Sequence, residues 1–188
     1  MFRLLVLVCL AASLLPALAL SPSSRSLLTR IEGLAEGSSR GVDASANAEI
    51  VAAIDQLRAS YTPSPASLDL VEGEWELLWT TERETLFLSR AGLLGNRCLS
   101  VRQSISRDSL RNSILFDRDA SFEVEGDVSR EGVRSYFKFR RATLRLPPLV
   151  RLPLPPVGKG WFDTVYVDRN LRVSFDVRGD YLVCRRAG

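Results

Sequence analysis

Residues 154–173 hold the pattern most suggestive of phosphate chemistry, because Lys159 lies between two glycines. A phosphate-binding loop has four residues between its first glycine and a Gly-Lys-Ser/Thr triplet, and a helix follows at once. Here Gly160 and Trp161 follow the lysine, and the next residues are typical of a strand. The pattern therefore favours a tight turn that uses Gly158 and Gly160 and leaves Lys159 exposed at its tip.

Several carboxylates near the C-terminal end could suggest acid–base chemistry: Asp163, Asp168, Asp176 and Asp180. Asp168 and Asp180 lie in turn signals, where an aspartate hydrogen-bonds its own backbone. Asp163 differs, because it lies on an apolar strand in parity with Trp161 and Val165. This parity predicts that the Asp163 carboxylate faces inward.

An inward carboxylate needs a partner, because burying an unpaired charge is costly. Arg172 and Arg178, on the following strands, are the candidate partners of Asp163. No histidine, second in-line carboxylate or metal-ligand spacing accompanies it, so a structural ion pair is favoured over a catalytic acid.

The chain contains no histidine at all. This excludes Ser-His triads and zinc sites that use imidazole. Cys98, Ser104 and Ser106 could be proposed as nucleophiles, but none has an identifiable base. We therefore predict no catalytic residue, no metal site and no cofactor.

The composition is that of one globular domain, with 188 residues, 25% charged residues and a formal net charge of +3. Such a balance does not indicate nucleic-acid binding. Only Lys138 and Lys159 are lysines, so almost every cation is arginine. Arginine suits phosphate or anionic lipid head groups, although codon bias explains the same excess.

The N-terminus reads as a targeting segment. Arg3 precedes an apolar run that ends in the small residues Ala17 and Ala19, which predicts a signal peptide over residues 1–19. An uncleaved membrane anchor is the alternative, because the run is close to spanning length. Residues 20–26 are predicted to be a short transit-like or disordered segment. Cys98 and Cys184 remain in the mature chain, either paired or as two buried thiols.

The periodicity divides the remaining chain, residues 27–188, into two parts. Apolar residues recur at three- and four-residue steps over about residues 27–60, which predicts two short helices separated by the glycines near residue 40. Short alternating segments, rich in β-branched and aromatic residues, follow over about residues 70–186 and predict an antiparallel sandwich or barrel. Five prolines between residues 147 and 156 place that segment at an edge or in a long connection.

The strands carry more aromatic residues than a small barrel needs to fill its centre, although core packing explains them equally well. The candidates for lining a ligand pocket are Trp79, Phe116, Phe137, Phe139, Trp161, Tyr166 and Phe175.

Three blocks together resemble the plastid lipid-associated protein family, also called plastid fibrillins or plastoglobulins. They are the helical opening LLTRIEGLAEGSSRGVDASANAEIVAAIDQL, the strand LVEGEWELLWTT, and the end LPPVGKGWFDTVYVDRNLRVSFDVRGDYLVCRR. The resemblance runs from about Leu27 to Arg186. It implies a mainly β fold, a lipocalin-like antiparallel barrel preceded by two helices, that holds an apolar compound such as a carotenoid, quinone, tocopherol or acyl lipid.

The resemblance also implies roles for single residues. Gly73 and Trp75 match the Gly-x-Trp of lipocalins, in which the tryptophan closes the barrel base against a basic residue of the last strand. Arg185 or Arg186 would be that residue here, in a cation–π stack. The acid of the family's signature falls on Asp163 or Asp168. The N-terminus is shorter than a land-plant transit peptide, and a signal peptide suits an alga whose plastid is reached through the endomembrane system; secretion is the alternative.

Three functions follow from these observations and from the resemblance. The first is a non-catalytic carrier of an apolar lipid or isoprenoid in a plastid. The second is a structural coat on plastid lipid globules or thylakoids, in which the helices of residues 27–57 lie on the lipid. The third is an accessory partner of a prenyl-quinone biosynthetic enzyme. The sequence leaves the oligomeric state open.

Overall fold

The computed structural model describes residues 21–34, 44–148, 150–155 and 158–188. The predicted signal peptide lies outside these residues. The helices are α1 (Pro22–Glu32), α2 (Ala44–Ala59), α3 (Pro65–Leu68) and α4 (Arg83–Ala91), and the 3₁₀ turn η1 spans Asp69–Val71. The strands are β1 (Gly73–Thr80), β2 (Cys98–Ile105), β3 (Ser109–Phe116), β4 (Ser121–Glu131), β5 (Arg134–Leu146), β6 (Val150–Leu154), β7 (Lys159–Val167), β8 (Leu171–Asp176) and β9 (Tyr181–Arg186).

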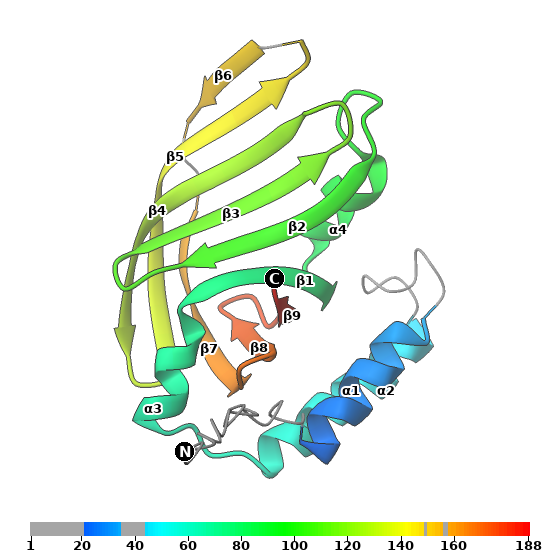
Figure 1. Ribbon diagram of the computed structural model, residues 1–188, viewed down its shortest axis with the longest axis vertical. Coiled ribbons are helices and arrows are strands. Elements are labelled where there is room, and N and C mark those ends of the chain that lie inside the picture. The colour runs from blue at the N-terminus through cyan, green and yellow to red at the C-terminus, as the bar shows by residue number, and fades with distance from the viewer. Residues whose placement is uncertain (1–20, 35–43, 149, 156–157) are drawn as a thin grey trace, which may run out of the picture.

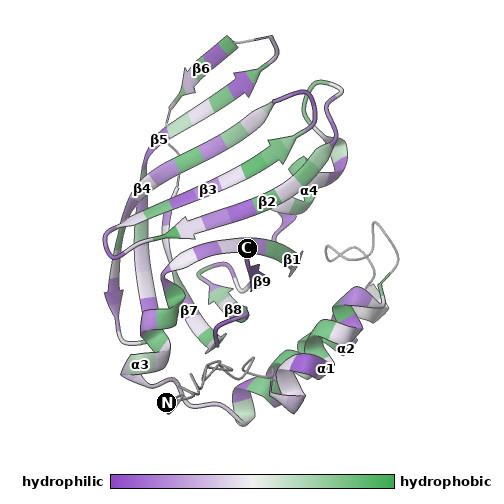
Figure 2. Cartoon of the chain, in the orientation of Figure 1, coloured by the Kyte–Doolittle hydropathy of each residue, from purple (hydrophilic) through white to green (hydrophobic). Residues whose placement is uncertain are grey.

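The sheet of the described residues is antiparallel and closes on itself. Its strands are ordered β4-β3-β2-β1-β9-β8-β7-β5-β6, and an additional pairing of β4 with β5 completes a ring from which only β6 is excluded. Bands of hydrophobic and hydrophilic residues alternate along β3, β4 and β5, as expected when one face lines an interior (Figure 2). The predicted lipocalin-like barrel is confirmed.

The proline-rich segment forms an edge, as expected. β5 pairs with β7 through residues 134–138 and with β6 through residues 142–146, so the β5–β6 hairpin continues beyond the closed part of the barrel (Figure 1). Pro153 lies on β6, which has a partner on one side only. Such an edge tolerates a residue without an N–H donor.

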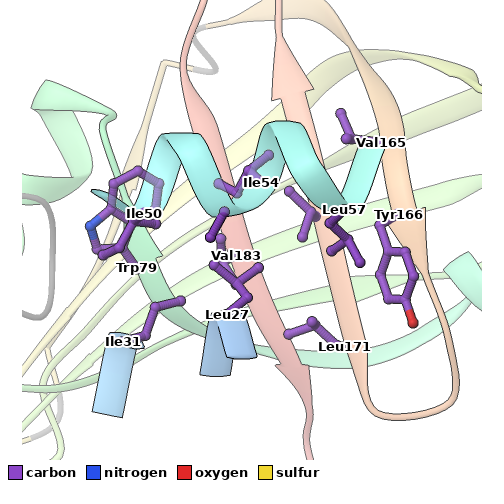
Figure 3. Close-up of a cluster of buried hydrophobic side chains, with 12 residues drawn as sticks. Leu27, Ile31, Ile50, Ile54, Leu57, Trp79, Val165, Tyr166, Leu171 and Val183 are labelled. Atoms are coloured by element: carbon purple, nitrogen blue, oxygen red, sulfur yellow. The ribbon is translucent and has the colours of Figure 1, made fainter. Parts of the chain in front are cut away.

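Helices α1 and α2 lie side by side against the outer wall of the barrel (Figure 1). Figure 3 shows Ile50, Ile54 and Leu57 of α2 directed at the strands, where they meet Trp79 and Tyr166 among others. The three α2 side chains are almost completely buried. The apolar stripe of these helices is therefore occupied by the protein itself.

The first helix begins earlier than we expected. Ser21 accepts a hydrogen bond from the backbone N–H of Ser24 and so caps α1, and Pro22 occupies its first turn, where a missing N–H donor has no cost. Residues 22–26, expected to be transit-like or disordered, therefore form the start of a helix. Within the described residues, no helix is both long and apolar enough to cross a bilayer.

The base of the barrel is closed around Trp75. Its indole N–H donates to the carbonyl of Val71 at 2.8 Å, and the guanidinium of Arg186 lies 4.0 Å from its ring centroid. Arg186 also donates to the carbonyls of Glu72 and Leu70, at 2.6 and 2.7 Å. These contacts join the last strand to the segment that leads into β1. Arg185, the other residue considered for this role, instead forms an ion pair with Glu76 at 2.8 Å.

Gly73 makes room for this stack. Its φ is +130°, and a Cβ at this position would lie 1.9 Å from Nη1 of Arg186. Gly73→Ala should therefore lower the free energy of unfolding by about 2–3 kcal/mol through backbone strain and displacement of Arg186. The measurement is urea denaturation followed by tryptophan fluorescence.

Gly132→Ala is the matched control, because Gly132 also has a positive φ but no other atom lies within 4 Å of the place that a Cβ would take there. It should lose only about 1 kcal/mol, the cost of the left-handed conformation alone. Equal losses in the two variants would contradict a specific requirement for space beside Arg186.

Candidate functional site

The barrel encloses a cavity of about 260 Å³. Its wall combines inward residues of β1 to β5 and β9 with residues of α4 and the segment before it. The lining residues are Leu77, Glu82, Glu84, Thr85, Leu88, Val101, Arg102, Gln103, Asn112, Ile114, Phe122, Val124, Phe139, Arg178, Leu182 and Cys184. Most of this wall is hydrocarbon, with a few polar groups, which is the usual construction of a site for an apolar small molecule.

Helix α4 lies beside the cavity between the end of β1 and the start of β2. Leu88 and Thr85 contribute to the wall from this helix. Glu84 and Arg178 form an ion pair at 2.6 Å, and both side chains are more than half exposed. This exposed pair marks the rim, so the cavity meets solvent beside α4.

Glu82 is a carboxylate that faces the cavity from the N-cap of α4. Burial raises the pKa of the Glu82 carboxyl, the hydrogen bond from the Thr85 hydroxyl at 2.5 Å opposes this, and the negative charge of Asp176 adds to it. Glu82 therefore takes up a proton more readily than an exposed glutamate.

A second, smaller cavity of about 60 Å³ adjoins the first. Gln103, Asn112 and Leu182 line both cavities, so the two are neighbours. Phe137 and Phe162 belong to the wall of the smaller one. The Gln103 side-chain amide donates to Oδ1 of Asn112 at 2.8 Å, which gives this part of the interior an ordered polar strip.

Arg172 is completely buried inside the barrel. Its Nη2 donates to Oε1 of Gln103 and makes a 3.8 Å contact with Sγ of Cys184. Its guanidinium carbon lies 5.2 Å from the ring centroid of Trp75 and 5.6 Å from that of Phe162. Burial lowers the pKa of Arg172 and raises the pKa of the Cys184 thiol.

Among the residues that the structure describes, no three of His, Cys, Asp and Glu gather where they could hold a metal ion. Cys98 and Cys184 are both buried and are not joined in a disulfide.

Comparison with known proteins places the chain in a family. The PAP_fibrillin family model matches residues 22–185. The chain belongs to the PAP/fibrillin family. It is 42% identical over 143 residues to the probable plastid-lipid-associated protein 11, chloroplastic, of Arabidopsis thaliana, a match that covers 74% of this chain and 67% of the relative.

A second relative of this fibrillin chain is the probable plastid-lipid-associated protein 12, chloroplastic, also of Arabidopsis thaliana. The two are 30% identical over 140 residues, which is 65% of this chain but only 34% of the relative. A solved lipocalin-like protein from Bacteroides uniformis ATCC 8492 aligns with 63% of this chain and 99% of its own length, with a TM-score of 0.41 and 14% identity.

The aromatic residues predicted to line a pocket are divided among several places in this fibrillin chain. Phe139 lines the larger cavity and Phe137 the smaller one. Phe116 packs in a separate cluster with Cys98. The other four lie on the outer face: Trp79, Tyr166 and Phe175 in the cluster beneath α1 and α2, and Trp161 beneath Arg134. For these five residues, the assignment to the pocket was wrong.

Two β-bulges explain why Trp79 and Tyr166 face outward. The register of β1 on β9 shifts between Leu77 and Trp79, and the register of β7 on β8 shifts between Thr164 and Tyr166. A bulge inserts one residue, so the residues beyond it exchange faces. Leu77 therefore faces the cavity while Trp79, two positions later, faces the helices.

The predicted partners of Asp163 were also wrong. Asp163 accepts two hydrogen bonds from Arg134, at 2.7 and 2.8 Å, and the Arg134 guanidinium lies 3.8 Å from the Trp161 ring centroid. Arg172 lies inside the barrel, and Arg178 pairs with Glu84.

The prediction failed because Asp163 lies on the outer face of its strand. Phe162 belongs to the interior cluster around Trp75. Trp161 and Asp163 consequently face out, and Val165 is buried only because α1 and α2 cover it. An outer face that is covered by helices is as apolar as an inner face. The sequence alone therefore does not show which face of a strand points into the barrel.

Sequence reasoning missed the polar interior residues Glu82, Gln103 and Asn112, and it named Arg172 only as a candidate partner of Asp163. One signal was present for Arg172: along β8, residues Arg172, Ser174 and Asp176 alternate with Leu171, Val173 and Phe175. That alternation was compatible with either face, and the polar residues proved to be the inward set.

The raised pKa of Glu82 predicts a pH-dependent difference between the protein and its Glu82→Gln variant. The folded state holds the Glu82 proton more tightly than the unfolded chain, so stability falls as the pH rises above the ordinary value of 4.5 toward the folded pKa. Glu82→Gln removes this loss. The stability of the variant relative to the unaltered protein should therefore increase between about pH 4 and pH 7, as measured by urea denaturation at each pH.

Thr85→Val is the complementary variant, because it removes the hydrogen bond that lowers the Glu82 pKa. In that background the divergence caused by Glu82→Gln should extend to higher pH. Parallel stability profiles for all the proteins would show that Glu82 is as well solvated in the folded state as in the unfolded chain.

Proposed function

We propose that this fibrillin-family chain is a non-catalytic lipid-binding protein that holds one apolar small molecule in its barrel. The observation that carries the proposal is the mainly hydrocarbon cavity of about 260 Å³ that meets solvent beside α4. Its binding energy would come from burial, at about 25 cal/mol per Å² of apolar surface removed from water.

The size of the cavity narrows the ligand class. A volume of about 260 Å³ lies just below the usual range of ligand pockets, roughly 300–1,000 Å³. A single acyl or prenyl chain suits this space better than a carotenoid. The end of a longer chain would extend past Leu88 and the rim.

The proposed location is a plastid, on the grounds that the two Arabidopsis relatives carry names that place them in the chloroplast. A signal peptide in residues 1–19 would bring the chain to a plastid that is reached through the endomembrane system. These residues lie outside the described part of the chain.

The carrier is tested by lipid retention. The purified protein is incubated with a mixture of acyl and prenyl lipids, separated from unbound lipid, extracted and analysed by mass spectrometry. We expect about one retained molecule per chain, because the cavity has room for a single hydrocarbon tail. A folded protein that retains nothing would overturn the carrier function.

Val124→Phe should lower the retained lipid to less than about a fifth, because Val124 is buried in the cavity wall and a larger side chain takes the place of ligand. Val133→Phe is the matched control, since Val133 lies exposed outside the strands and away from the cavity. Equal retention by the two folded variants would place the lipid somewhere other than this cavity.

A second candidate function is association with an anionic lipid surface through α4 and the loop after it. Phe87 and Leu94 have exposed fractions of 69% and 77%. Arg83 and Arg90 flank Phe87 on the same helix. Exposed apolar side chains between arginines suit a surface of anionic head groups over hydrocarbon. The stripes of α1 and α2 do not offer such a surface, because they are packed against the barrel.

Vesicle flotation tests this second candidate. Phe87→Ser should weaken binding to phosphatidylcholine vesicles containing phosphatidylglycerol by about tenfold, the value of one large apolar side chain. Val133→Ser, at an exposed site outside this helix, should leave binding unchanged. If the unaltered protein does not float with these vesicles, the surface role is wrong.

A further inference from the structure

Arg172 is a buried cation with no carboxylate partner in the part of the chain that the structure describes. Its exposed fraction is 0%, and its Nε and Nη1 atoms have no hydrogen-bond acceptor among the described residues. Only Nη2 is engaged, by the amide oxygen of Gln103 and the Cys184 sulfur. A buried guanidinium normally has a carboxylate or several carbonyls around it, because its desolvation is costly.

The groups around Arg172 do not neutralise it. The Cys184 thiol is kept in its neutral form, since burial raises its pKa. Arg186, on the Trp75 ring that Arg172 also approaches, adds a second positive charge. Glu82 faces the same cavity, but its carboxylate accepts from Thr85. Arg172 and Arg186 therefore place two positive charges beside Trp75, at the base of the barrel.

Arg172 contacts side chains that line both cavities. Gln103 and Cys184, the two groups that contact Nη2, both line the larger cavity. Gln103 and Phe162 line the smaller one, and Phe162 is also within 5.6 Å of the Arg172 guanidinium carbon. Gln103 thus contacts the guanidinium and also lines both cavities.

We infer that the barrel binds a long-chain carboxylic acid with its carboxylate on Arg172 and its tail directed toward α4. The inference rests on the proposed carrier function and gives it a substrate class. The planar carboxylate matches the fork of guanidinium donors, and its single charge balances that of Arg172. The Gln103 amide, which now bonds Asn112, is a further donor within reach of the same place.

The polar groups of the rim favour this orientation over the reverse one. At the rim, Arg178 already has Glu84 as its partner, and both are solvated. Glu82 and Asp176, which line the inner space on that side, would repel an acid head group held near them. A carboxylate gains most at Arg172, where a charge-assisted hydrogen bond is shielded from water.

The test compares oleic acid with methyl oleate, which has the same chain without the charge. Binding of each to the unaltered protein is measured at neutral pH by competition with a fluorescent fatty acid and by lipid retention. We expect the acid to bind about tenfold or more tightly, because charge-assisted hydrogen bonds are the strong ones. Equal affinities for acid and ester would overturn the inference while leaving the carrier function in place; binding of neither would overturn both.

The variant Arg172→Met tests whether the carboxylate binds at Arg172 or at the rim of the cavity. It removes the charge while retaining an unbranched side chain, and loss of an uncompensated buried charge should leave the protein as stable or more stable. Arg172→Met should abolish the preference for the acid without weakening the ester. Arg178→Met, at the rim of the same cavity, should keep the preference. Loss of the preference in Arg178→Met alone would place the carboxylate at the rim and contradict the inference.

A measurement on the unaltered protein covers the case in which Arg172→Met does not fold. Oleic acid labelled with carbon-13 at the carboxyl group is bound, and its chemical shift is followed as the pH is lowered. A carboxylate paired with Arg172 should remain ionised to lower pH than free oleate in water. Protonation at a higher pH than in water would show a head group without a cation beside it, and would overturn the inference.

Discussion

Trp75 is held at the base of the barrel by two arginines, and much of the structure follows from this contact. Arg186 lies 4.0 Å from the ring centroid and satisfies its donors on the carbonyls of Leu70 and Glu72, so that the last strand is joined to the chain that precedes the first. Arg172 lies 5.2 Å from the same ring, on the side of the interior cluster. The indole thus closes the barrel and forms a cation–π contact with a buried guanidinium.

The β-bulges determine which side chains fill the interior above this base. In β1, Trp75 and Leu77 face inward, and the shift before Trp79 sends that indole to the helices. In β7, Phe162 faces inward and Tyr166 does not. Had both large rings remained inside, they would have occupied the volume in which the cavity lies. Because each bulge exchanges the faces of the residues beyond it, a small barrel can carry many aromatic residues and still enclose space.

This arrangement explains which features of the structure could be predicted from the sequence. The change from helical to strand periodicity and the edge position of the prolines depend on local spacing, whereas the contact of Trp75 with an arginine of the last strand was implied by the family resemblance. The inner and outer faces were not separable in the same way, because α1 and α2 cover the outer face of β7, β8 and β9 and make it apolar. Asp163 was assigned inward on that basis, and Arg172 or Arg178 was assigned as its partner. A bulge or a covering helix is a tertiary feature, and strand alternation alone contains neither.

The buried polar residues of the interior, Arg172 above all, lower the stability of the barrel. A core built for stability would place a hydrophobic residue at position 172, since replacing a buried charge by an apolar group of similar size is often stabilising. Here the guanidinium is retained, with two of its nitrogens unpartnered among the described residues, against Gln103 and beneath a space that the surrounding side chains leave open. Such a residue costs stability in the empty protein and regains it only when an anion is beside it. Binding of the proposed acid beside Arg172 would therefore stabilise the fold, and occupancy and stability would rise together.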